Sequence, residues 1–335
     1  MGHVPVLLNE AVAALNLQSS GVYVDGTFGR GGHAQAILTQ LGEAGTLIAL
    51  DRDPEAANAA QIMMQKDHRL RFVQTRFSLL AEALRQQGVA QVDGVLLDLG
   101  ISSPQIDQGE RGFSFRQDAP LDMRMDPTQG ESAADFLARA SQQHITKVLK
   151  NYGEERFAPS IARAIVAARE ERPIRRTGEL AKIVAQSLGA RVRGDWQQDP
   201  ATRTFQALRI QVNEEFEEIM RALPIIVSLM KAGARLAVIS FHSLEDRLVK
   251  RFIARASRTS ADDDALRHMP IKTQYLPEPM LKVVGRTIKA SAKEVASNTR
   301  ARSAILRVAE RTHAPFDAAE MKRIERDAFA GYERA

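Results

Sequence analysis

The 335-residue sequence contains no cysteine. That absence excludes disulfide bonds, thiolate metal sites and a cysteine nucleophile, and it is typical of a protein in the reducing cytoplasm. The N-terminus, MGHVPVLLNEAV, lacks a basic segment followed by a long apolar run, so we expect no signal peptide. No apolar run approaches the roughly 18 residues of a membrane-spanning helix. The seven histidines show no metal-ligand spacing, so we predict no protein-bound catalytic metal.

The net charge of +5 is unevenly distributed along the chain. Residues 1–110 hold 7 Lys or Arg against 12 Asp or Glu, whereas residues 139–209 hold 14 against 7 and residues 247–311 hold 15 against 6. Basic segments of this size attract polyanions through counterion release. They can also be ordinary solvated helix faces. The asymmetry favours a nucleic acid as the partner.

Short apolar segments alternate with helical ones over the first 100 residues. We expect strands at residues 22–24, 46–50, 70–74, 92–100 and 235–241, with two last antiparallel strands at 281–284 and 303–308. The run at 92–100 is almost continuously apolar, as a strand buried on both faces should be. This alternation predicts an α/β fold with a doubly wound, mostly parallel sheet whose ligands lie at the carboxyl ends of the strands.

The alternation stops near residue 110 and gives way to helical segments at 131–140, 159–171 and 177–189. Ser132 and Asp135 have the spacing of a capping box at the first of them. Residues 204–223 carry apolar side chains at steps of three and four, which predicts one long helix that Pro224 kinks or ends. We therefore predict a discontinuous α/β domain (1–109 and 204–311), a helical insertion for substrate recognition (110–203) and a C-terminal tail (312–335).

The first strand runs into a glycine-rich turn, DGTFGRGGH, before a helix begins. Glycine lets the backbone turn sharply and lets a ligand approach the free N–H groups at the helix start. The turn does not match the GxGxxG dinucleotide fingerprint, and no Lys-Ser/Thr pair follows it, which argues against a nucleoside triphosphate. Asp51 lies 22 residues after Gly29, a spacing that suits a carboxylate accepting both hydroxyls of an adenosine ribose. Asp51 alone could equally be the N-cap of the next helix.

The stretch LLDLGISSPQ, residues 96–105, follows the fourth strand. Its polar residue, small residue and proline resemble the loop with which amino-group methyltransferases hold an exocyclic amine. Such an amine is a poor nucleophile, and an acceptor that bonds its hydrogens favours in-line attack on a methyl sulfonium. We predict that Ser102, Ser103 and Pro104 form this catalytic loop. The alternative is an ordinary turn.

Ten segments together resemble one protein family, in the right order from His3 to about Arg311. They are HVPVLLNE, DGTFGRGGH, LDRDP, LLDLGISSPQ, RGFSF, PLDMRMD, YGEERF, TFQALRIQVNEE, ISFHSLEDRLVKRF and RARSAILRV. The family is the bacterial ribosomal small-subunit RNA (cytosine-N4) methyltransferase H family, also called MraW. The resemblance implies an S-adenosylmethionine-dependent enzyme that methylates the N4 amine of a decoding-centre cytidine, cytosine 1402, in the 16S rRNA of the small ribosomal subunit. It also implies a seven-stranded, Rossmann-like methyltransferase sheet with a helical domain that helps to bind the cytidine.

The resemblance also assigns site residues, motif by motif. The cofactor contacts fall on Gly31, Gly32, His33, Asp51, Phe77, Asp98 and Gln105. The sequence departs from the family at Thr299, where proline is usual, and over residues 259–284.

Two of these residues have simpler readings. His33 could have a solvated ring at the helix start, and Phe77 could be a core residue.

Four further residues are candidate substrate contacts: Arg111, Phe113, Phe115 and His242. The first three combine a cation with aromatic rings, as contacts to single-stranded RNA do; the alternative is a hydrophobic plug under the insertion. His242 follows the fifth strand and could border the cleft. Its neighbour Ser243 can also be read as the cap of the next helix, with Asp246 at capping-box spacing.

Two other functions stay open from the sequence. One is methylation of another amine, in DNA or a small molecule. The other is an RNA-binding ribosome-assembly factor that keeps a vestigial cofactor pocket. Methylation at a pyrimidine C5 carbon is excluded, because it needs a covalent thiolate. The sequence leaves the oligomeric state open.

Overall fold

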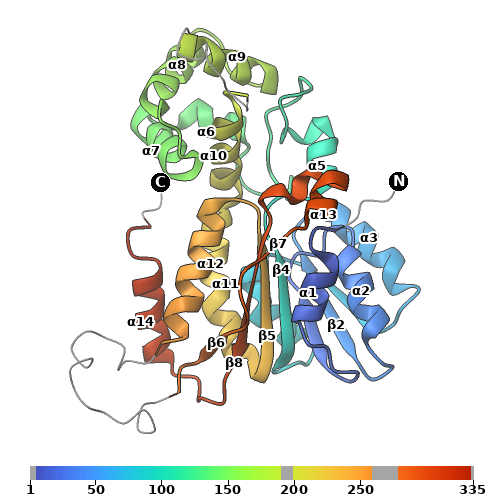
Figure 1. Ribbon diagram of the computed structural model, residues 1–335. Coiled ribbons are helices and arrows are strands. Elements are labelled where there is room, and N and C mark those ends of the chain that lie inside the picture. Colours follow the sequence, from blue (N-terminus) through green and yellow to red (C-terminus); the bar gives the residue numbers. More distant parts are fainter. Residues whose placement is uncertain (1–4, 190–198, 259–277, 333–335) are drawn as a thin grey trace, which may run out of the picture. The chain divides into compact units, whose positions relative to one another are not determined.

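The structure is a computed structural model in which residues 5–189, 199–258 and 278–332 are described. The chain divides into two compact units (Figure 1). The first unit comprises Met1–Gly100 and Phe216–Tyr332, and the second comprises Ile101–Glu215. The helical insertion expected at residues 110–203 therefore lies within a unit that is longer at both ends.

The first unit contains one eight-stranded sheet with the order β3-β2-β1-β4-β5-β8-β6, and β7 also pairs with β8. The strands are β1 (Val22–Asp25), β2 (Thr46–Asp51), β3 (Leu70–Gln74), β4 (Val92–Asp98), β5 (Met230–Ser240), β6 (Leu281–Val283), β7 (Ile288–Lys289) and β8 (Ile305–Arg311). Strands β1 to β5 are parallel, and β8 runs antiparallel to β5. The prediction of a doubly wound, mostly parallel α/β sheet is confirmed.

The expected number of seven strands is wrong by one. The segment that leads up to β8 pairs with it twice, first as β6 opposite Arg311 and then as β7 opposite Leu306. Between the two lies Gly285, with a φ of 65° that interrupts the extended backbone. Both strands occupy the same side of β8, so the sheet is still seven positions wide.

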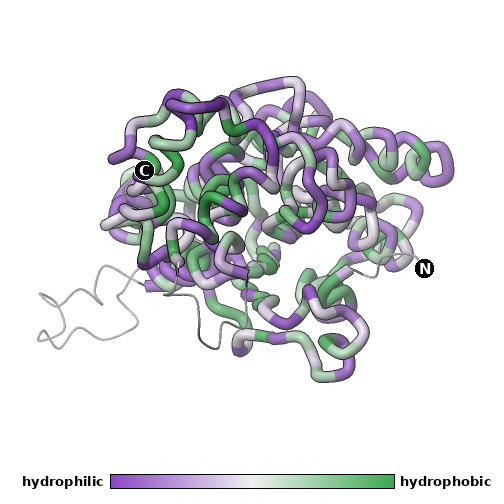
Figure 2. Tube along the Cα trace, turned by 90° about the horizontal axis from the view of Figure 1, so that it is seen from above, coloured by the Kyte–Doolittle hydropathy of each residue, from purple (hydrophilic) through white to green (hydrophobic). Residues whose placement is uncertain are grey.

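Helices of the first unit cover the sheet (Figure 1). They are α1 (Leu8–Ala14), α2 (Gly32–Gln40), α3 (Pro54–Met64), α4 (Leu80–Gln86), α11 (Glu215–Leu229), α12 (Ser243–Ala256), α13 (Ala292–Ser297) and α14 (Ala318–Ala328), with the short 3-10 turns η1 (Phe77–Leu79) and η6 (Thr299–Ser303). One hydrophobic cluster joins α1, α2 and α3 to β1, β2 and β8. Hydrophilic and hydrophobic residues alternate along the helices (Figure 2), as burial of one helix face requires.

The second unit is built from helices. They are α5 (Ser103–Asp107), η2 (Gly109–Arg111), α6 (Ala133–Arg139), α7 (Gln142–Gly153), α8 (Ala158–Glu171), α9 (Thr177–Leu188) and α10 (Thr202–Asn213). Helix α7 packs against both α8 and α10. At the start of α6, Ser132 and Asp135 form the predicted capping box.

The single long helix expected over residues 204–223 is two helices. Glu214 has a left-handed backbone, with φ 51°, and separates α10 from α11. The apolar periodicity continues across this break, which is why the pattern alone did not show it. Pro224 lies inside α11 and does not end it.

The expected C-terminal tail contains a helix, α14, whose N-terminus is capped by Asp317. Among the described residues, no helix has both the length and the apolar character needed to cross a membrane. Most of the 259–284 region that departs from the family lies outside the described residues.

Candidate functional site

The turn between β1 and α2 is held by hydrogen bonds to the carboxyl ends of neighbouring strands. Gly26 N donates to Leu96 O of β4 at 2.9 Å, and Phe28 N donates to Leu50 O of β2 at the same distance. Gly29 N donates to Asp51 Oδ2 at 2.7 Å. The turn thus lies over the functional edge of the sheet, here defined as the carboxyl ends of β1 to β5.

The glycines of this turn serve different purposes. Gly29 has φ 56°, and a Cβ placed there would meet nothing within 4 Å. Gly31 has φ 77°, and its Cβ would lie 2.6 Å from Met63 Cε, while a Cβ on Gly32 would clash with Pro5. Gly31 and Gly32 are therefore required by packing of the protein on itself, and Gly29 faces open space. Helix α2 starts without a side-chain cap, so its first N–H groups are available to a ligand.

Asp51 ends β2 and is held by two backbone donors. Its Oδ2 accepts from Gly29 N and its Oδ1 from Asp53 N at 2.9 Å. Burial raises the pKa of Asp51, and these two hydrogen bonds oppose the rise. The N-cap of α3 is Asp53, which accepts from Glu55 N at 3.0 Å, so the reading of Asp51 as that cap is wrong. Each carboxylate oxygen has a further lone pair, which leaves Asp51 able to accept ligand hydroxyls.

Three acidic residues meet at the functional edge and form what we call the acid cluster: Asp25, Asp98 and Glu245. Asp25 is 1% exposed and Glu245 is 0% exposed. Asp25 Oδ1 accepts from Thr27 N at 3.1 Å, whereas Asp25 Oδ2 and Asp98 Oδ1 are buried without a hydrogen-bond partner among the described residues.

The acid cluster changes the acidity of its members. Burial, together with the negative charge of Asp51, raises the pKa of Asp25 to about 7. Burial first, then the charges of Asp25 and Glu245, raises the pKa of Asp98 well above its usual range. Buried carboxylate oxygens that accept no hydrogen bond from the described residues, such as Asp25 Oδ2 and Asp98 Oδ1 here, mark a site where a cation would be stabilised.

His33 lies against the acid cluster. Its Nδ1 is 3.6 Å from Asp98 Oδ2, and its Nε2 is 3.2 Å from Val6 O. Because a carbonyl only accepts, Nε2 donates to Val6 and Nδ1 is the nitrogen that faces Asp98. The ring is 5% exposed, so the reading of His33 as a solvated residue is wrong. Thr27 Oγ1 accepts from Asp98 N at 2.6 Å and fixes the same strand end.

His242 and Glu245 form the cap of α12 at the end of β5. Glu245 Oε2 accepts from Phe241 N at 2.9 Å and from His242 N at 3.3 Å, and His242 Nδ1 accepts from Glu245 N at 3.4 Å. His242 Nε2 is 3.1 Å from Glu245 Oε1. The expectation that Ser243 caps this helix is therefore wrong. Its expected partner Asp246 instead forms an ion pair with Arg307, at 2.6 Å.

Phe77 begins η1, three residues after the last residue of β3, and is half-buried. A Cβ placed on Gly26 would lie 3.4 Å from Phe77 Cβ, so this side chain lies beside the glycine turn. The preceding residue, Arg76, reaches the buried Glu218 with Nη1 3.4 Å from its Oε1. The structure thus brings Gly31, Gly32, His33, Asp51, Phe77, Asp98 and His242 together in the first unit.

The other predicted site residues belong to the second unit. Ser102 N donates to Gln105 Oε1 at 2.9 Å, and Pro104 lies in the first turn of α5, so the SSPQ stretch forms a helix start. Gln105 is 4% exposed. The side chain of Ser103 lies outside the described part of the chain. The role of these four residues toward a cofactor or an amine remains a prediction.

Arg111, Phe113 and Phe115 pack within the second unit. Arg111 Nη2 donates to Met125 O at 2.8 Å, and its guanidinium lies 5.9 Å from the centroid of the Phe113 ring. Phe113 is 8% exposed, and the ring of Phe115 meets that of Phe205 edge-on at 4.9 Å. These contacts agree with the hydrophobic-plug alternative, and the proposed RNA contacts of the three residues remain a prediction.

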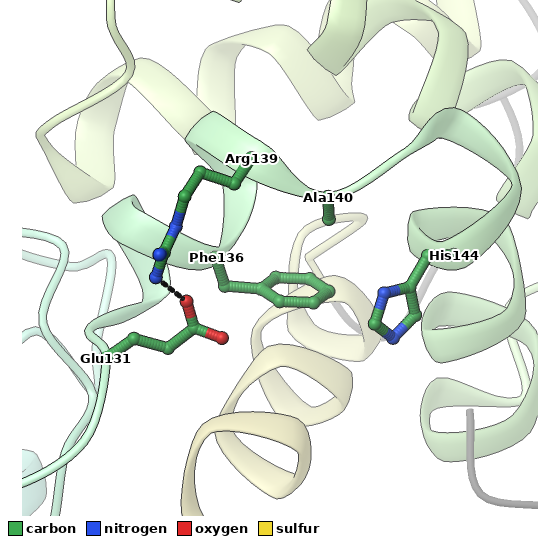
Figure 3. Close-up of a pocket in the computed structure, with 5 residues that line it drawn as sticks. All are labelled: Glu131, Phe136, Arg139, Ala140 and His144. Carbon is green, nitrogen blue, oxygen red and sulfur yellow. Dashed lines mark hydrogen bonds and ion pairs between the residues drawn. The ribbon is translucent and has the colours of Figure 1, made fainter.

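A pocket of about 530 Å³ lies elsewhere in the second unit (Figure 3). It is lined by Glu131, Phe136, Arg139, Ala140 and His144. The rings of Phe136 and His144 meet edge-on at 5.1 Å, and Arg139 forms an ion pair with Glu131. No residue predicted from the sequence lines this pocket. Across the described ranges, no group of three or more His, Cys, Asp or Glu side chains is arranged to hold a metal ion.

Two members of the acid cluster, Asp25 and Glu245, are not among the residues predicted from the sequence. Asp25 could have been found, because it is the last residue of a buried strand and precedes the glycine turn. Glu245 lies in the first turn of a helix, and its spacing from His242 is that of an ordinary capping residue. The sequence therefore gives no sign that it belongs to the site.

Comparisons with known proteins give one consistent result. Residues 1–312 match the model of the MraW methylase family. A protein of Neisseria meningitidis named "Ribosomal RNA small subunit methyltransferase H" is 56% identical over 313 residues, which cover 93% of this chain and 94% of the relative. A protein of the same name from Methylobacillus flagellatus is 57% identical over 312 residues, covering 92% and 94%. Among solved structures, a putative rRNA-methylase from Clostridium thermocellum aligns with a TM-score of 0.43 and 10% identity over 92% of this chain and 100% of that one, too weak a similarity to support an inference.

Proposed function

The chain belongs to the MraW methylase family, and from this premise we propose that it is an S-adenosylmethionine-dependent methyltransferase acting on 16S rRNA. Its curated relatives carry the name of a small-subunit ribosomal RNA methyltransferase. We propose that the methylated atom is N4 of the decoding-centre cytidine, that the substrate is presented by the small ribosomal subunit, and that the enzyme works in the cytoplasm.

The observation that carries this proposal is the acid cluster. S-adenosylmethionine is a cation at its sulfonium and at its α-ammonium group. Asp25 and Asp98 each place a buried carboxylate oxygen without a described partner at the functional edge. Binding a cation there would relieve the cost of burying these charges. The residues present therefore fit this cofactor.

The remaining cofactor contacts follow from the same edge. Asp51 would accept the ribose hydroxyls, and Phe77 would lie by the adenine. The N-terminus of α2 and the open space at Gly29 would admit the methionine end. When bound, the cofactor supplies an electrophilic methyl group on its sulfonium.

The chain's own contribution to catalysis is positioning. No cysteine is available for covalent chemistry. His33, fixed by Val6 O, restrains Asp98, and Thr27 holds the backbone of the same strand end. We propose that the loop of Ser102, Ser103 and Pro104 holds the target amine in line with the methyl group.

Recognition of the RNA is assigned to the second unit. Exposed basic side chains on α7 and α8 and in the turns before α8 and α9 include Lys147, Lys150, Arg156, Arg163 and Arg175. Phosphate contacts of this kind weaken as salt concentration rises. A target base buried in its RNA would have to be flipped out, with this unit forming one wall of its pocket.

The test supplies labelled S-adenosylmethionine to small subunits from a strain that lacks the protein, to naked 16S rRNA and to DNA. We expect label in N4-methylcytidine from one of the two RNA substrates, identified by mass spectrometry of the nucleosides. Label only in DNA would replace this function with the DNA-methylating alternative. Calorimetry that detects no cofactor binding would leave the assembly factor as the better description.

A further inference from the structure

Residues 313–332 lie beyond the match to the family model, which ends at residue 312. They nevertheless fold onto the first unit. Helix α14 buries Met321, Ile324 and Ala328 and packs against α12, beside which it lies in Figure 1. Burial of these three apolar side chains gives the segment a defined position.

The segment runs antiparallel to α12, toward the functional edge. Asp327 lies near the C-terminus of α12, with Oδ2 3.6 Å from Arg255 Nη2. Two residues later, Phe329 stacks on Phe252, with ring centroids 5.9 Å apart and an interplanar angle of 9°. The chain therefore moves along α12 toward its N-terminus, where His242 is the cap.

The last described residue, Tyr332, reaches the end of this path. Its ring meets the ring of Phe216 edge-on, at 5.3 Å and 86°. Phe216 is 0% exposed, and its ring lies 5.7 Å from that of His242. Phe216 is thus enclosed between the C-terminal segment and the His242–Glu245 cap.

The cap in turn belongs to the acid cluster. Glu245 accepts from the backbone of both Phe241 and His242, and its charge raises the pKa of Asp98. A rotation of the His242 ring would change the contact that its two nitrogens make with Glu245. The ring of Phe216, 5.7 Å from that of His242, is one of the groups that border the space for such a rotation.

We propose that the C-terminal segment is a positioning element of the active site, acting from Tyr332 through Phe216 on His242 and Glu245. This inference rests on the proposed methyltransferase function. Tyr332 and Phe216 are positioning residues, because the contacts that define them are with protein side chains. In this proposal the segment fixes side chains at the functional edge, although residues 313–332 lie beyond the part of the chain that the family model covers.

The test compares three variants of the full-length protein. Tyr332→Ala removes the ring from Phe216, and Tyr332→Phe keeps it. Met321→Ala is the matched control, because it weakens the same helix at the end remote from His242. We expect Tyr332→Ala to lower kcat on small subunits about 2- to 10-fold, the range that one edge-to-face ring contact provides, with the Kd for S-adenosylmethionine unchanged. Tyr332→Phe should retain kcat, and Met321→Ala should lower the Tm while leaving kcat within twofold.

A second readout needs no methyl transfer. The NMR signal of the His242 ring, assigned by its loss in His242→Gln, should shift in Tyr332→Ala and stay in place in Met321→Ala. The shift can also be observed in a protein that methylates no substrate. In that case the proposed function is wrong, and the positioning role of the C-terminal segment is still supported. An unshifted His242 signal with an unchanged kcat, or an equal loss of kcat in Met321→Ala, overturns the positioning role.

Discussion

Two aspartates at opposite ends of strand β4 show how differently the same side chain is used in this sheet. Asp93, at the amino end, accepts from Val22 N at 2.8 Å and from Lys231 Nζ at 2.8 and 3.0 Å. Asp98, at the carboxyl end, keeps a buried oxygen without a partner in the described structure and faces Asp25 and Glu245.

The difference separates stability from function along one strand. At the amino end the charge is neutralised by the protein itself, so it contributes to folding. At the functional edge the negative charges of Asp25 and Glu245 raise the pKa of Asp98, and a cationic ligand would stabilise the ionised carboxylates. The acid cluster therefore destabilises the free protein and favours the bound one. Three substitutions test this contrast.

The largest effect is expected for Asp25→Asn. The pKa of Asp25 is about 7 in the folded state against an ordinary 3.8, so between these values the unfolded chain releases a proton that the folded protein retains. The contribution of Asp25 to the free energy of unfolding is most favourable below about pH 4. It declines by about 4 kcal/mol as pH rises through 7. Urea unfolding at pH 5 and pH 8 should show that the wild type loses stability relative to Asp25→Asn, which should be the more stable protein at pH 8.

The matched control is Asp93→Asn at the other end of the sheet. It removes a charge that Lys231 neutralises, so at pH 8 it should leave the protein no more stable than the wild type. If both variants changed the free energy of unfolding at pH 8 by the same amount, the two ends of the sheet would not differ in how they balance the charge of an aspartate.

The next effect concerns Asp51→Ala. Loss of a charge-assisted acceptor for the ribose should weaken the binding of S-adenosylmethionine by about 1–3 kcal/mol, measured by calorimetry. Asp53→Ala, two residues away, removes the cap of α3 but keeps the backbone N–H that Asp51 accepts, and it should cost about 1 kcal/mol of stability with the affinity unchanged. An affinity that responds equally to both changes would mean that the ribose site is misplaced.

The smallest effect is expected for Lys231→Met at the amino end. The Lys231 side chain is 43% exposed, and Asp93 keeps the Val22 N–H donor, so the loss should be at most about 1 kcal/mol. The difference from the wild type should shrink in high salt, because solvent ions screen an exposed pair. A change in cofactor affinity in this variant would contradict the separation of the two ends.

Much of the functional edge could be predicted because it depends on local patterns. Apolar runs ending in Asp51 and Asp98 identify strand ends, and parallel strands bring their carboxyl ends together. What the pattern could not show is which carboxylates lack partners, because partners come from distant segments. Asp25 looks like any aspartate before a turn until its surroundings are known.

The cap of α12 also could not be identified from the local sequence alone. His242 with Glu245 and Ser243 with Asp246 have the same spacing, so the local pattern fits both. The choice is made by Arg307, 61 residues along the chain, which pairs with Asp246. The break at Glu214 was also invisible, because glutamate rarely takes a left-handed backbone and the apolar spacing continues across it.

The position of β8 has a consequence for how the protein is made. Ile305–Arg311 pairs with β5 on one side and with β6 and β7 on the other, so the sheet is incomplete until residue 311 has been synthesised. Until then β5 is an unpaired edge, open to strands of other chains. We expect newly made protein to be most prone to aggregate after residue 240 has emerged and before residue 305 follows, and premature termination in that interval to yield insoluble product.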